Sequence, residues 1–286
     1  MRFRMIRSAG RDGLAGCRDG ASWRALFDGD AGYPGDLDVI IRQGDGALAR
    51  AADALAKGAV VDPEKFETLP PFRRANKILC VGLNYLAHAQ ESGTTVPEYP
   101  TVFARFGTGL VGHGQALIKP KLSDMFDYES ELAVIIGRRG RHISQADALS
   151  HVAGYSIFND GSIRDYQLRT PQWTIGKNFD GTGSFGPDFV TSDAVPPGAA
   201  GLRMTGRLNG ETVQQTLTSD LIFNVEKLVS LISAAMTLES GDVISTGTPS
   251  GVGLSFKPPK MMKAGDVFEI EIEKIGTLRN PVVNET

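Results

Sequence analysis

The sequence predicts a β-rich protein of the α+β class. From Lys77 onward, short apolar runs are joined by glycine and other turn residues, which is the pattern of strands linked by tight turns. Asn209–Gly210 lies between two segments of alternating polarity, a strong signal for a β-hairpin. Helical patterns are few and do not alternate regularly with the strands, so a parallel βαβ sheet is not expected.

Residues 1–70 are expected to form a small N-terminal domain, because their pattern is weaker and they end at a pair of prolines. They contain an acidic stretch, DGDAGYPGDLDVI, and one alanine-rich helix candidate, GALARAADALAKGA. Pro70–Pro71 disfavours the continuation of regular structure. We therefore place a domain boundary there, with residues 71–286 forming the larger domain.

The larger domain contains five further strand candidates and two helix candidates. The strand candidates are KILCVGL (77–83), TVFARF (101–106), DYESELAVIIG (127–137), VAGYSIFND (152–160) and DVFEIEIEKIG (266–276). The first helix candidate, SQADALSH (144–151), begins with a capping-box pattern. The second covers about 221–237, where Leu221, Val225, Leu228, Ile232 and Ala235 form one apolar stripe.

Composition and charge argue against several classes of protein. A net charge of −3 gives no reason to expect nucleic acid or an acidic membrane as partner. Cys17 and Cys80 provide neither a disulfide framework nor the CxxC spacing of a zinc site. The sequence has no run of about 18 apolar residues and no apolar core of a secretion signal near Met1. We expect a cytoplasmic protein with no membrane or nucleic-acid partner.

Three acids at every second position, Asp127, Glu129 and Glu131, precede an apolar strand candidate. Alternate side chains of a strand share one face, where like charges repel and burial of unpaired charge is costly. A divalent cation would neutralise them, and carboxylates without histidine or cysteine favour a hard ion such as Mg²⁺ or Mn²⁺. Asp160, at the end of another strand candidate, is a further candidate ligand. The alternation leaves open which two of the three acids bind, and a solvent-exposed acidic strand is the alternative.

Two other segments carry candidate catalytic groups. His88 and Glu91 are three residues apart in NYLAHAQESG, which places them on one side of a helical turn. A histidine paired with a carboxylate is a candidate general base for activating water, whereas an ordinary exposed helix is the alternative. Lys177 follows a tryptophan-containing apolar segment and is a candidate substrate contact, the alternative being a solvated lysine.

Two glycine-rich segments predict different structures. GTGSFG (181–186) matches the dinucleotide-binding fingerprint, but Pro187 follows at once and no βαβ unit surrounds it, so we predict a turn. STGTPSGVG (245–253) follows a strand candidate and lacks the ending of a P-loop. Its backbone amides and the hydroxyls of Thr246 and Thr248 are candidate ligands for an anionic group such as a carboxylate.

The order of these motifs resembles the fumarylacetoacetate hydrolase family. The resemblance is carried by ILCVGLNYLAHAQESG, YESELAVIIG, GYSIFNDGSIRDYQ, QWTIGKNFDGTGSFGP and LESGDVISTGTPSGVG, and it spans about residues 76–283. It implies the family's mixed β-sandwich roll, usually assembled as a homodimer. It also implies metal ligands at Glu129, Glu131 and Asp160, with Mg²⁺ or Mn²⁺ as the ion and Ca²⁺ as a third candidate.

The resemblance also implies roles for the surrounding residues. His88 and Glu91 match the family's water-activating pair, on a lid over about residues 84–95, flanked by Gly82 and Gly93. Positions that contact the substrate in relatives match Arg164, Gln167, Lys177 and Thr248. Two departures stand out. Arg105 replaces a lysine of many short relatives and is expected to bind the far end of the substrate, and Gly161 is expected to widen the pocket.

The activity implied is metal-dependent hydrolysis of a carbon–carbon bond in a 1,3-dicarbonyl acid of the acylpyruvate or fumarylacetoacetate type. Water activated by His88 would attack a carbonyl, and the cation with Lys177 would stabilise the enolate left by bond fission. Decarboxylation of oxaloacetate or another 2-oxo acid, and isomerisation of 2-oxo dienoic acids, are alternatives that use the same enolate. A non-catalytic ligand-binding protein is a further alternative, which the complete set of His88, Glu91 and Lys177 disfavours.

Overall fold

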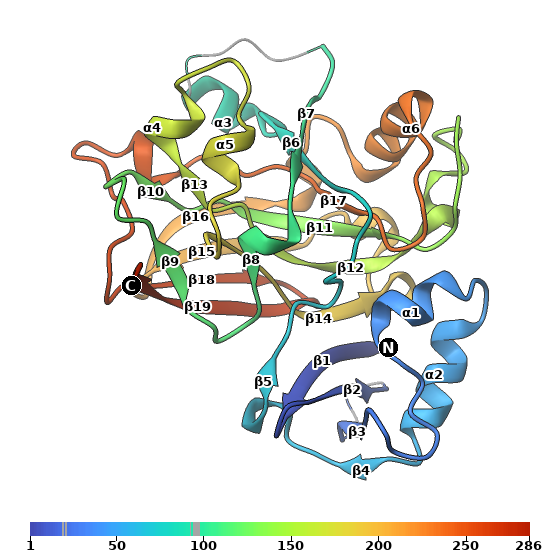
Figure 1. The fold of residues 1–286 in the computed structure, drawn as a ribbon. Coiled ribbons are helices and arrows are strands. Elements are labelled where there is room, and N and C mark those ends of the chain that lie inside the picture. The colour runs from blue at the N-terminus through green and yellow to red at the C-terminus, as the bar shows by residue number, and fades with distance from the viewer. Residues whose placement is uncertain (19, 21, 92, 94–97) are drawn as a thin grey trace.

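A large and a small β-sheet dominate the computed structural model, which describes residues 1–286 except 19, 21, 92 and 94–97 (Figure 1). The large sheet has 12 strands in the order β4-β3-β2-β1-β14-β12-β11-β17-β6-β7, with β5 paired to β1 and β8 paired to β14. Its strands are β1 (Arg2–Ser8), β2 (Arg11–Cys17), β3 (Arg24–Phe27), β4 (Ala59–Val60), β5 (Glu67–Thr68), β6 (Ile78–Gly82), β7 (Thr101–Arg105), β8 (Leu110–Val111), β11 (Ser130–Ile136), β12 (Val152–Asn159), β14 (Gly183–Thr191) and β17 (Val243–Ser245).

The remaining strands form two smaller sheets, and six α-helices are described in addition. A five-stranded sheet has the order β16-β15-β18-β19-β9, and β10 pairs with β13. These strands are β9 (Leu117–Lys119), β10 (Phe126–Asp127), β13 (Ser162–Ile163), β15 (Arg203–Leu208), β16 (Glu211–Leu217), β18 (Val267–Ile272) and β19 (Gly276–Asn284). The helices are α1 (Leu37–Arg42), α2 (Ala47–Leu55), α3 (Leu86–Glu91), α4 (Arg164–Gln167), α5 (Thr174–Lys177) and α6 (Val225–Ala235).

The α+β class predicted from the sequence is confirmed. Most strand pairs are antiparallel, and the parallel pairs among the described residues are β17 with β6, β14 with β8 and β19 with β9. The Asn209–Gly210 hairpin forms between β15 and β16, with both turn residues at positive φ. No helix in the described part of the chain is long and apolar enough to cross a membrane.

Strand β11 explains why the site lies in the interior of the molecule. Leu132 and Val134 face the core that includes β18, whereas Ala133 and Ile135 face a second core that includes Phe3 of β1. A strand buried on both faces reads as a continuous apolar run, which is why the segment after Glu131 lacks polar residues. The carboxylates at the start of this strand are therefore buried with it.

Three local predictions were wrong. The expected strand 127–137 is divided into β10 and β11, because the backbone N–H of Glu129 bonds to the Asn159 side chain rather than to a neighbouring strand. Residues 144–151 form a turn followed by a 3₁₀ helix, since the Ser144–Asp147 hydrogen bonds close a turn too short to nucleate an α-helix. Only the start of 181–186 is a turn, and its last four residues belong to β14.

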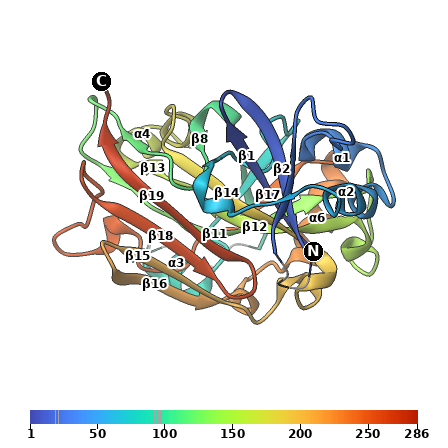
Figure 2. The same cartoon turned by 90° about the horizontal axis from the view of Figure 1, so that it is seen from below.

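The N-terminal segment continues the large sheet. β1 pairs with β14, and Figure 2 shows β1 and β2 beside that strand. Phe3 and Met5 share one apolar cluster with Phe158 and Phe189 of the later strands. The segment therefore covers one face of the sheet that carries the site. The division at Pro70–Pro71 remains a proposal.

Candidate active site

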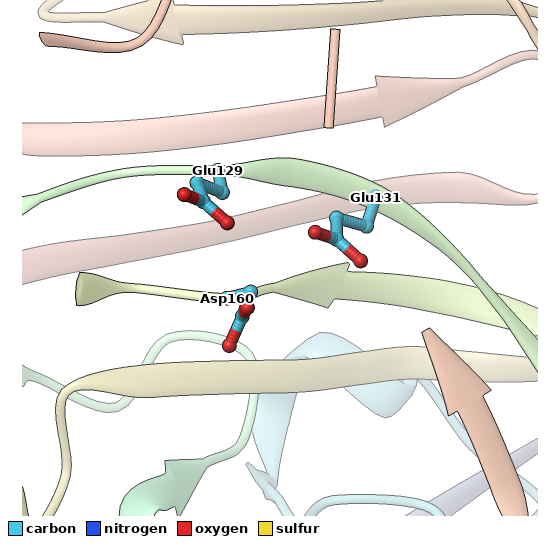
Figure 3. Close-up of side chains that lie close together, drawn as sticks. All are labelled: Glu129, Glu131 and Asp160. Carbon is cyan, nitrogen blue, oxygen red and sulfur yellow. The ribbon is translucent and has the colours of Figure 1, made fainter. Parts of the chain in front are cut away.

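Three buried carboxylates, those of Glu129, Glu131 and Asp160, offer ligand atoms that all lie within 4.8 Å of one another. Glu129 precedes β11, Glu131 lies on it, and Asp160 follows β12 (Figure 3). Ser130 pairs with Asn159, and the Asp160 N–H donates to the Glu129 carbonyl at 3.0 Å. The register between β11 and β12 therefore brings together the three acids that the resemblance implied.

Three cations from distant segments surround these acids. Lys177 Nζ lies 2.7 Å from both Glu129 Oε2 and Asp160 Oδ2. Arg164 donates to Glu129 Oε1 at 2.6 Å, and Arg105 pairs with Asp160. Burial alone would raise the pKa of Glu129, but Lys177 and Arg164 outweigh it and lower this pKa to about 2. Burial opposes the charge of Lys177 too, yet Asp160 and Glu129 hold the pKa of its ammonium group above the ordinary value.

Glu131 is the acid of the group that has no cationic partner among the described residues. Its Oε2 accepts hydrogen bonds from the Ser245 hydroxyl at 2.6 Å and the Gly247 N–H at 2.8 Å. Burial, followed by the negative charges of Asp160 and Glu129, raises the pKa of Glu131 well above its usual value. The site therefore contains an uncompensated negative charge whenever Glu131 is ionised.

The arrangement is suited to a divalent cation. Asp127, Glu129, Glu131 and Asp160 are countered by Arg105, Arg164 and Lys177, which leaves one negative charge in the buried group. A divalent ion would change this balance to one positive charge, which a monoanionic ligand would neutralise. Carboxylate oxygens are hard donors and have two lone pairs each, so they can accept a hydrogen bond and still coordinate a metal.

Asp127 has a different role from its neighbours. Its Oδ1 accepts from the Gly253 N–H at 2.6 Å, and its Oδ2 accepts from the Leu254 N–H at 2.9 Å and from Arg164 Nε at 2.8 Å. This carboxylate thus fixes the end of the glycine-rich loop and orients the Arg164 guanidinium. Arg164 Nη2 is buried and has no partner in the described residues, which makes it a candidate donor to a ligand.

The glycine-rich loop 246–252 binds carboxylates of the protein itself. The Gly247 N–H bonds to Glu131, and the Gly251 N–H donates to Glu91 Oε1 at 2.9 Å. The sequence predicted that these amides would bind an anion, and the structure supplies two from its own chain. Thr248 remains available to a ligand because it lines the cavity.

The His88–Glu91 pair lies on α3. His88 Nδ1 is 3.3 Å from Glu91 Oε2. Burial would raise the pKa of Glu91, but its hydrogen bonds to His88, Ser255 and Gly251 lower it, so the carboxylate stays charged. With Nδ1–H directed at Glu91, Nε2 is the nitrogen that can accept a proton. Of the lid expected over 84–95, residues 92, 94 and 95 lie outside the described part of the chain.

These groups surround one cavity of about 390 Å³. Its polar lining includes His88, Glu91, Glu129, Glu131, Arg164, Gln167, Lys177 and Thr248. Its apolar lining includes Val81, Leu83, Phe103, Leu168, Trp173, Val252 and Leu254. The structure thus brings together eight of the ten site residues predicted from the sequence. The other two, Asp160 and Arg105, are buried next to these residues and do not line the cavity themselves.

Arg105 does not reach the substrate position that the sequence suggested. Its side chain is buried, and it donates to Asp160, to the Gly161 carbonyl at 2.9 Å and to the Thr182 hydroxyl at 3.1 Å. The guanidinium does bind a carboxylate, but that carboxylate belongs to the site itself. Arg105 is therefore a residue that holds Asp160 in place.

Gly161 does not widen the pocket, contrary to the expectation from the sequence. A Cβ at this position would lie 2.0 Å from the Thr182 carbonyl oxygen, so glycine permits a close approach of two backbone segments. We expect Gly161→Ala to lower the free energy of unfolding by about 1–3 kcal/mol through overpacking. Denaturant titration measures this, with Gly109→Ala as the control, because Gly109 is not at positive φ and a Cβ there would come no closer than 3.4 Å to a neighbouring atom. Equal losses in both variants would contradict the steric explanation.

Sequence reasoning missed several contributors to the site. Ser245, the first residue of the glycine-rich segment, and Gln214 bind site residues through side chains to which the sequence analysis gave no role. Phe103 and Trp173 pack edge to face, with ring centroids 5.4 Å apart, and form one cavity wall. A Cβ at Gly82 would lie 2.3 Å from the Trp173 ring, so this glycine makes room for that wall. Such contacts join segments far apart in sequence, where a local pattern carries no signal.

The fold and the site define an enzyme in which buried acids and cations face a pocket of substrate size. Residues 77–283 match the family model described as fumarylacetoacetate (FAA) hydrolase C-terminal. The chain belongs to the fumarylacetoacetate hydrolase family, as the resemblance of its motifs implied.

The names of similar proteins refer to different reactions. The human "Oxaloacetate tautomerase FAHD2A, mitochondrial" is 40% identical over 257 residues, covering 89% of this chain and 82% of the relative. The solved fumarylacetoacetate hydrolase of Exiguobacterium antarcticum is 34% identical with a TM-score of 0.82. The solved 5-carboxymethyl-2-hydroxymuconate delta-isomerase of Mycobacterium smegmatis is 32% identical with a TM-score of 0.77. Both structural matches cover 100% of each chain, and the family roll expected from the sequence is confirmed.

Proposed function

We propose that this enzyme forms and stabilises the enolate of a 2-oxo acid, and that it interconverts the keto and enol forms of its substrate. The observation that carries this proposal is the geometry of one cavity. His88, which is oriented by Glu91, lines this cavity. The buried Lys177 lines it too and contacts the carboxylate of Glu129. One group can remove a proton from carbon while the other stabilises the negative charge that develops on oxygen.

The proton is assigned to His88. Because Nδ1 faces Glu91, Nε2 is the nitrogen that can accept a proton from the carbon next to the 2-oxo group. The Lys177 ammonium stays charged and stabilises the enolate oxygen, which takes a proton from water to give the enol, while His88 releases its proton to water. Glu91, fixed by the Gly251 N–H, keeps the imidazole in one orientation.

The substrate carboxylate is assigned to the donors on the cavity wall. Arg164 Nη2 is a buried donor without a partner in the described residues, and Thr248 offers a hydroxyl. Gln167 accepts from Arg164 through Oε1 at 2.8 Å, and its amide nitrogen, which has no partner in the described part of the chain, can donate to a ligand. Leaving such donors unpaired is costly, and an anionic ligand would satisfy them.

Glu129, Glu131 and Asp160 are the residues that would hold a divalent ion, for which Mg²⁺ and Mn²⁺ are the proposed candidates. When bound, such an ion supplies Lewis-acid polarisation of the substrate oxygens. The homodimer and the cytoplasmic location remain predictions.

Hydrolysis of a carbon–carbon bond in a 1,3-dicarbonyl acid is the second candidate. It is favoured by the cavity, because apolar side chains such as Phe103, Leu168 and Trp173 line it together with the polar groups. Such a lining suits the acyl group of an acylpyruvate. In this reaction His88 would accept a proton from water instead of from carbon.

Product analysis separates these reactions. We expect purified enzyme with Mg²⁺ to accelerate the loss of enol absorbance of freshly dissolved enol-oxaloacetate, while mass is conserved and no CO₂ is released beyond the uncatalysed rate. Release of CO₂ would instead identify a decarboxylase. An acylpyruvate converted into two acids would identify the hydrolase. Failure to accelerate any of these reactions would contradict the proposed enolate chemistry.

A further inference from the structure

Gln214 is a buried residue of β16 that lies outside the cavity yet contacts both the carboxylate strand and the glycine-rich loop. A β-bulge explains its position. Gly206 pairs with Gln214 and Arg207 with Thr212, so Val213 is the extra residue, and the bulge breaks the alternation of faces. Val213 and Gln214 are in consequence both buried, although they are neighbours in a strand.

The orientation of the Gln214 amide is fixed by backbone groups on both sides. Its Oε1 accepts the N–H of Ser130 at 2.9 Å, and its Nε2 donates to the Pro249 carbonyl at 3.0 Å. An amide turned the other way would place a donor against a donor and an acceptor against an acceptor. The second donor contact of Nε2 therefore also has a definite direction, toward the Thr248 hydroxyl oxygen at 2.9 Å.

This contact determines what Thr248 can do. Within the described part of the chain, the only hydrogen bond of the Thr248 side chain is the one it accepts from Gln214. Because that lone pair is occupied, the hydroxyl proton is free for another acceptor, and Thr248 lines the cavity. We propose that Gln214 is a positioning residue that makes Thr248 a hydrogen-bond donor toward an anionic ligand. This inference rests on the proposed role of Thr248 in binding the substrate carboxylate.

Close backbone approaches hold the contact in place. A Cβ at Gly206 would lie 2.4 Å from the Ser130 hydroxyl oxygen and 3.3 Å from Gln214 Oε1. A Cβ at Gly251 would lie 1.9 Å from the Val213 carbonyl oxygen, and Gly251 has a φ of +95°. The bulge and the loop thus fit together only with glycine at position 251. Gly251 also donates its N–H to Glu91, which orients His88. Strand β16 therefore supports both Thr248, the proposed donor, and His88, the proposed base.

The alternative is that Gln214 only satisfies two buried backbone groups. That role accounts for the contacts with Ser130 and Pro249 but not for the third contact, with Thr248. A double-mutant cycle separates the two explanations, because a purely structural loss would be the same with or without the threonine hydroxyl.

The experiment measures the affinity of oxalate for the Mg²⁺-loaded protein by titration calorimetry. Oxalate is a planar dianion that presents oxygens as the enolate of a 2-oxo acid does. The variants are Q214E, Q214M, T248V, T248S and Q214M/T248V. Glutamate keeps the acceptor for Ser130 but loses the donor, and so turns the Thr248 proton toward residue 214. Q214M removes both functions and provides a second test, and thermal melting identifies any variant that fails to fold.

We expect T248V and Q214E each to weaken oxalate binding about tenfold, the usual magnitude for a lost hydrogen bond to a charged group, while T248S stays near the parent. In the T248V background, Q214M, which adds no charge, should cost less than about twofold further. If replacing Gln214 weakened oxalate binding equally in the parent and in T248V, or if Q214E did not weaken it at all, the role proposed for Gln214 would be wrong. The proposed role of Thr248 would be unaffected. Unchanged binding in T248V would instead remove Thr248 from the proposed substrate site.

Discussion

Replacing Glu131 with glutamine is expected to stabilise the metal-free protein and to abolish its metal-dependent activity. Glu131 is buried beside the carboxyl groups of Glu129 and Asp160 and has no cationic partner in the described residues, so the amide removes an uncompensated charge. It keeps an oxygen for Ser245 and Gly247 and turns an NH₂ group toward the remaining carboxylates. We expect a gain of roughly 1–4 kcal/mol in the free energy of unfolding without metal.

The activity of the same variant should fall about a thousandfold, because Lewis-acid stabilisation of several kcal/mol is lost with the charged ligand. A single substitution would then have opposite effects on stability and on function, which is expected of a site built to hold a cation. Turnover with Mg²⁺ and denaturant titration with a chelator measure the two effects. Glu271→Gln is the matched control, because Glu271 is exposed on the surface and pairs with Arg207.

The stability gain should depend on pH. Since the folded protein raises the pKa of Glu131, the stabilising contribution of its neutral form is fully present below the ordinary glutamate pKa of about 4.3. That contribution is lost as the pH rises through the folded-state value. The difference between E131Q and the parent should therefore be small near pH 4 and larger at neutral pH, on the chelated proteins. A constant difference, or destabilisation by E131Q at neutral pH, would contradict the charge balance proposed for the site.

The sequence predicted the acidic residues of this site better than the cationic residues that pair with them. Alternation grouped Asp127, Glu129 and Glu131 and left their roles open, an apolar run ending at Asp160 suggested a further acid, and the family resemblance selected Glu129, Glu131 and Asp160. No pattern indicated that Lys177 and Arg164 would neutralise two of these charges, because the ion pairs join segments 17 to 48 positions apart. Such contacts arise from tertiary packing alone.

Arg105 shows how a correct chemical argument can place a residue wrongly. Arginine was expected to bind a carboxylate because its guanidinium matches that shape, and in the structure it does so. The missing information was the identity of the carboxylate, because Asp160 lies 55 positions further along the chain and only tertiary packing brings it to Arg105. Gln214 was missed for a related reason. Strict alternation would turn it toward solvent, and the bulge at Val213 has no local signature in the sequence.

The His88–Glu91 pair was found because it is local. Three residues of a helical turn separate the two side chains, so spacing alone predicted their contact. What spacing could not supply is the anchor of Glu91, the Gly251 N–H, which comes from 160 positions further along the chain. The contact within the pair is local, whereas the contact that holds Glu91 in place is not. Replacing His88 and replacing Glu91 should therefore have different effects on turnover.

Replacing His88 with asparagine is expected to reduce turnover by about 10²–10⁴-fold, the usual contribution of a general base, while leaving ligand affinity within about threefold. The reason is that Nε2 moves a proton, whereas the anchoring of the ligand is assigned to Arg164, Gln167 and Thr248. Steady-state kinetics and oxalate affinity measure the two quantities. His142→Asn is the matched control, since His142 is exposed and lies outside the cavity.

Glu91→Gln tests whether the carboxylate orients the base. The amide keeps the shape but loses the negative charge that favours Nδ1–H, so we expect an intermediate loss of about tenfold in turnover. If Glu91 acts through His88, the double variant should be no slower than His88→Asn alone, because residues that act as a unit are not additive. Additive losses would show that Glu91 has a separate role, and an unchanged turnover number in His88→Asn would place the base elsewhere in the cavity. Non-additive losses with intact oxalate binding would assign the proton transfer to this pair, because substrate anchoring and metal binding would both be unaffected in the variants.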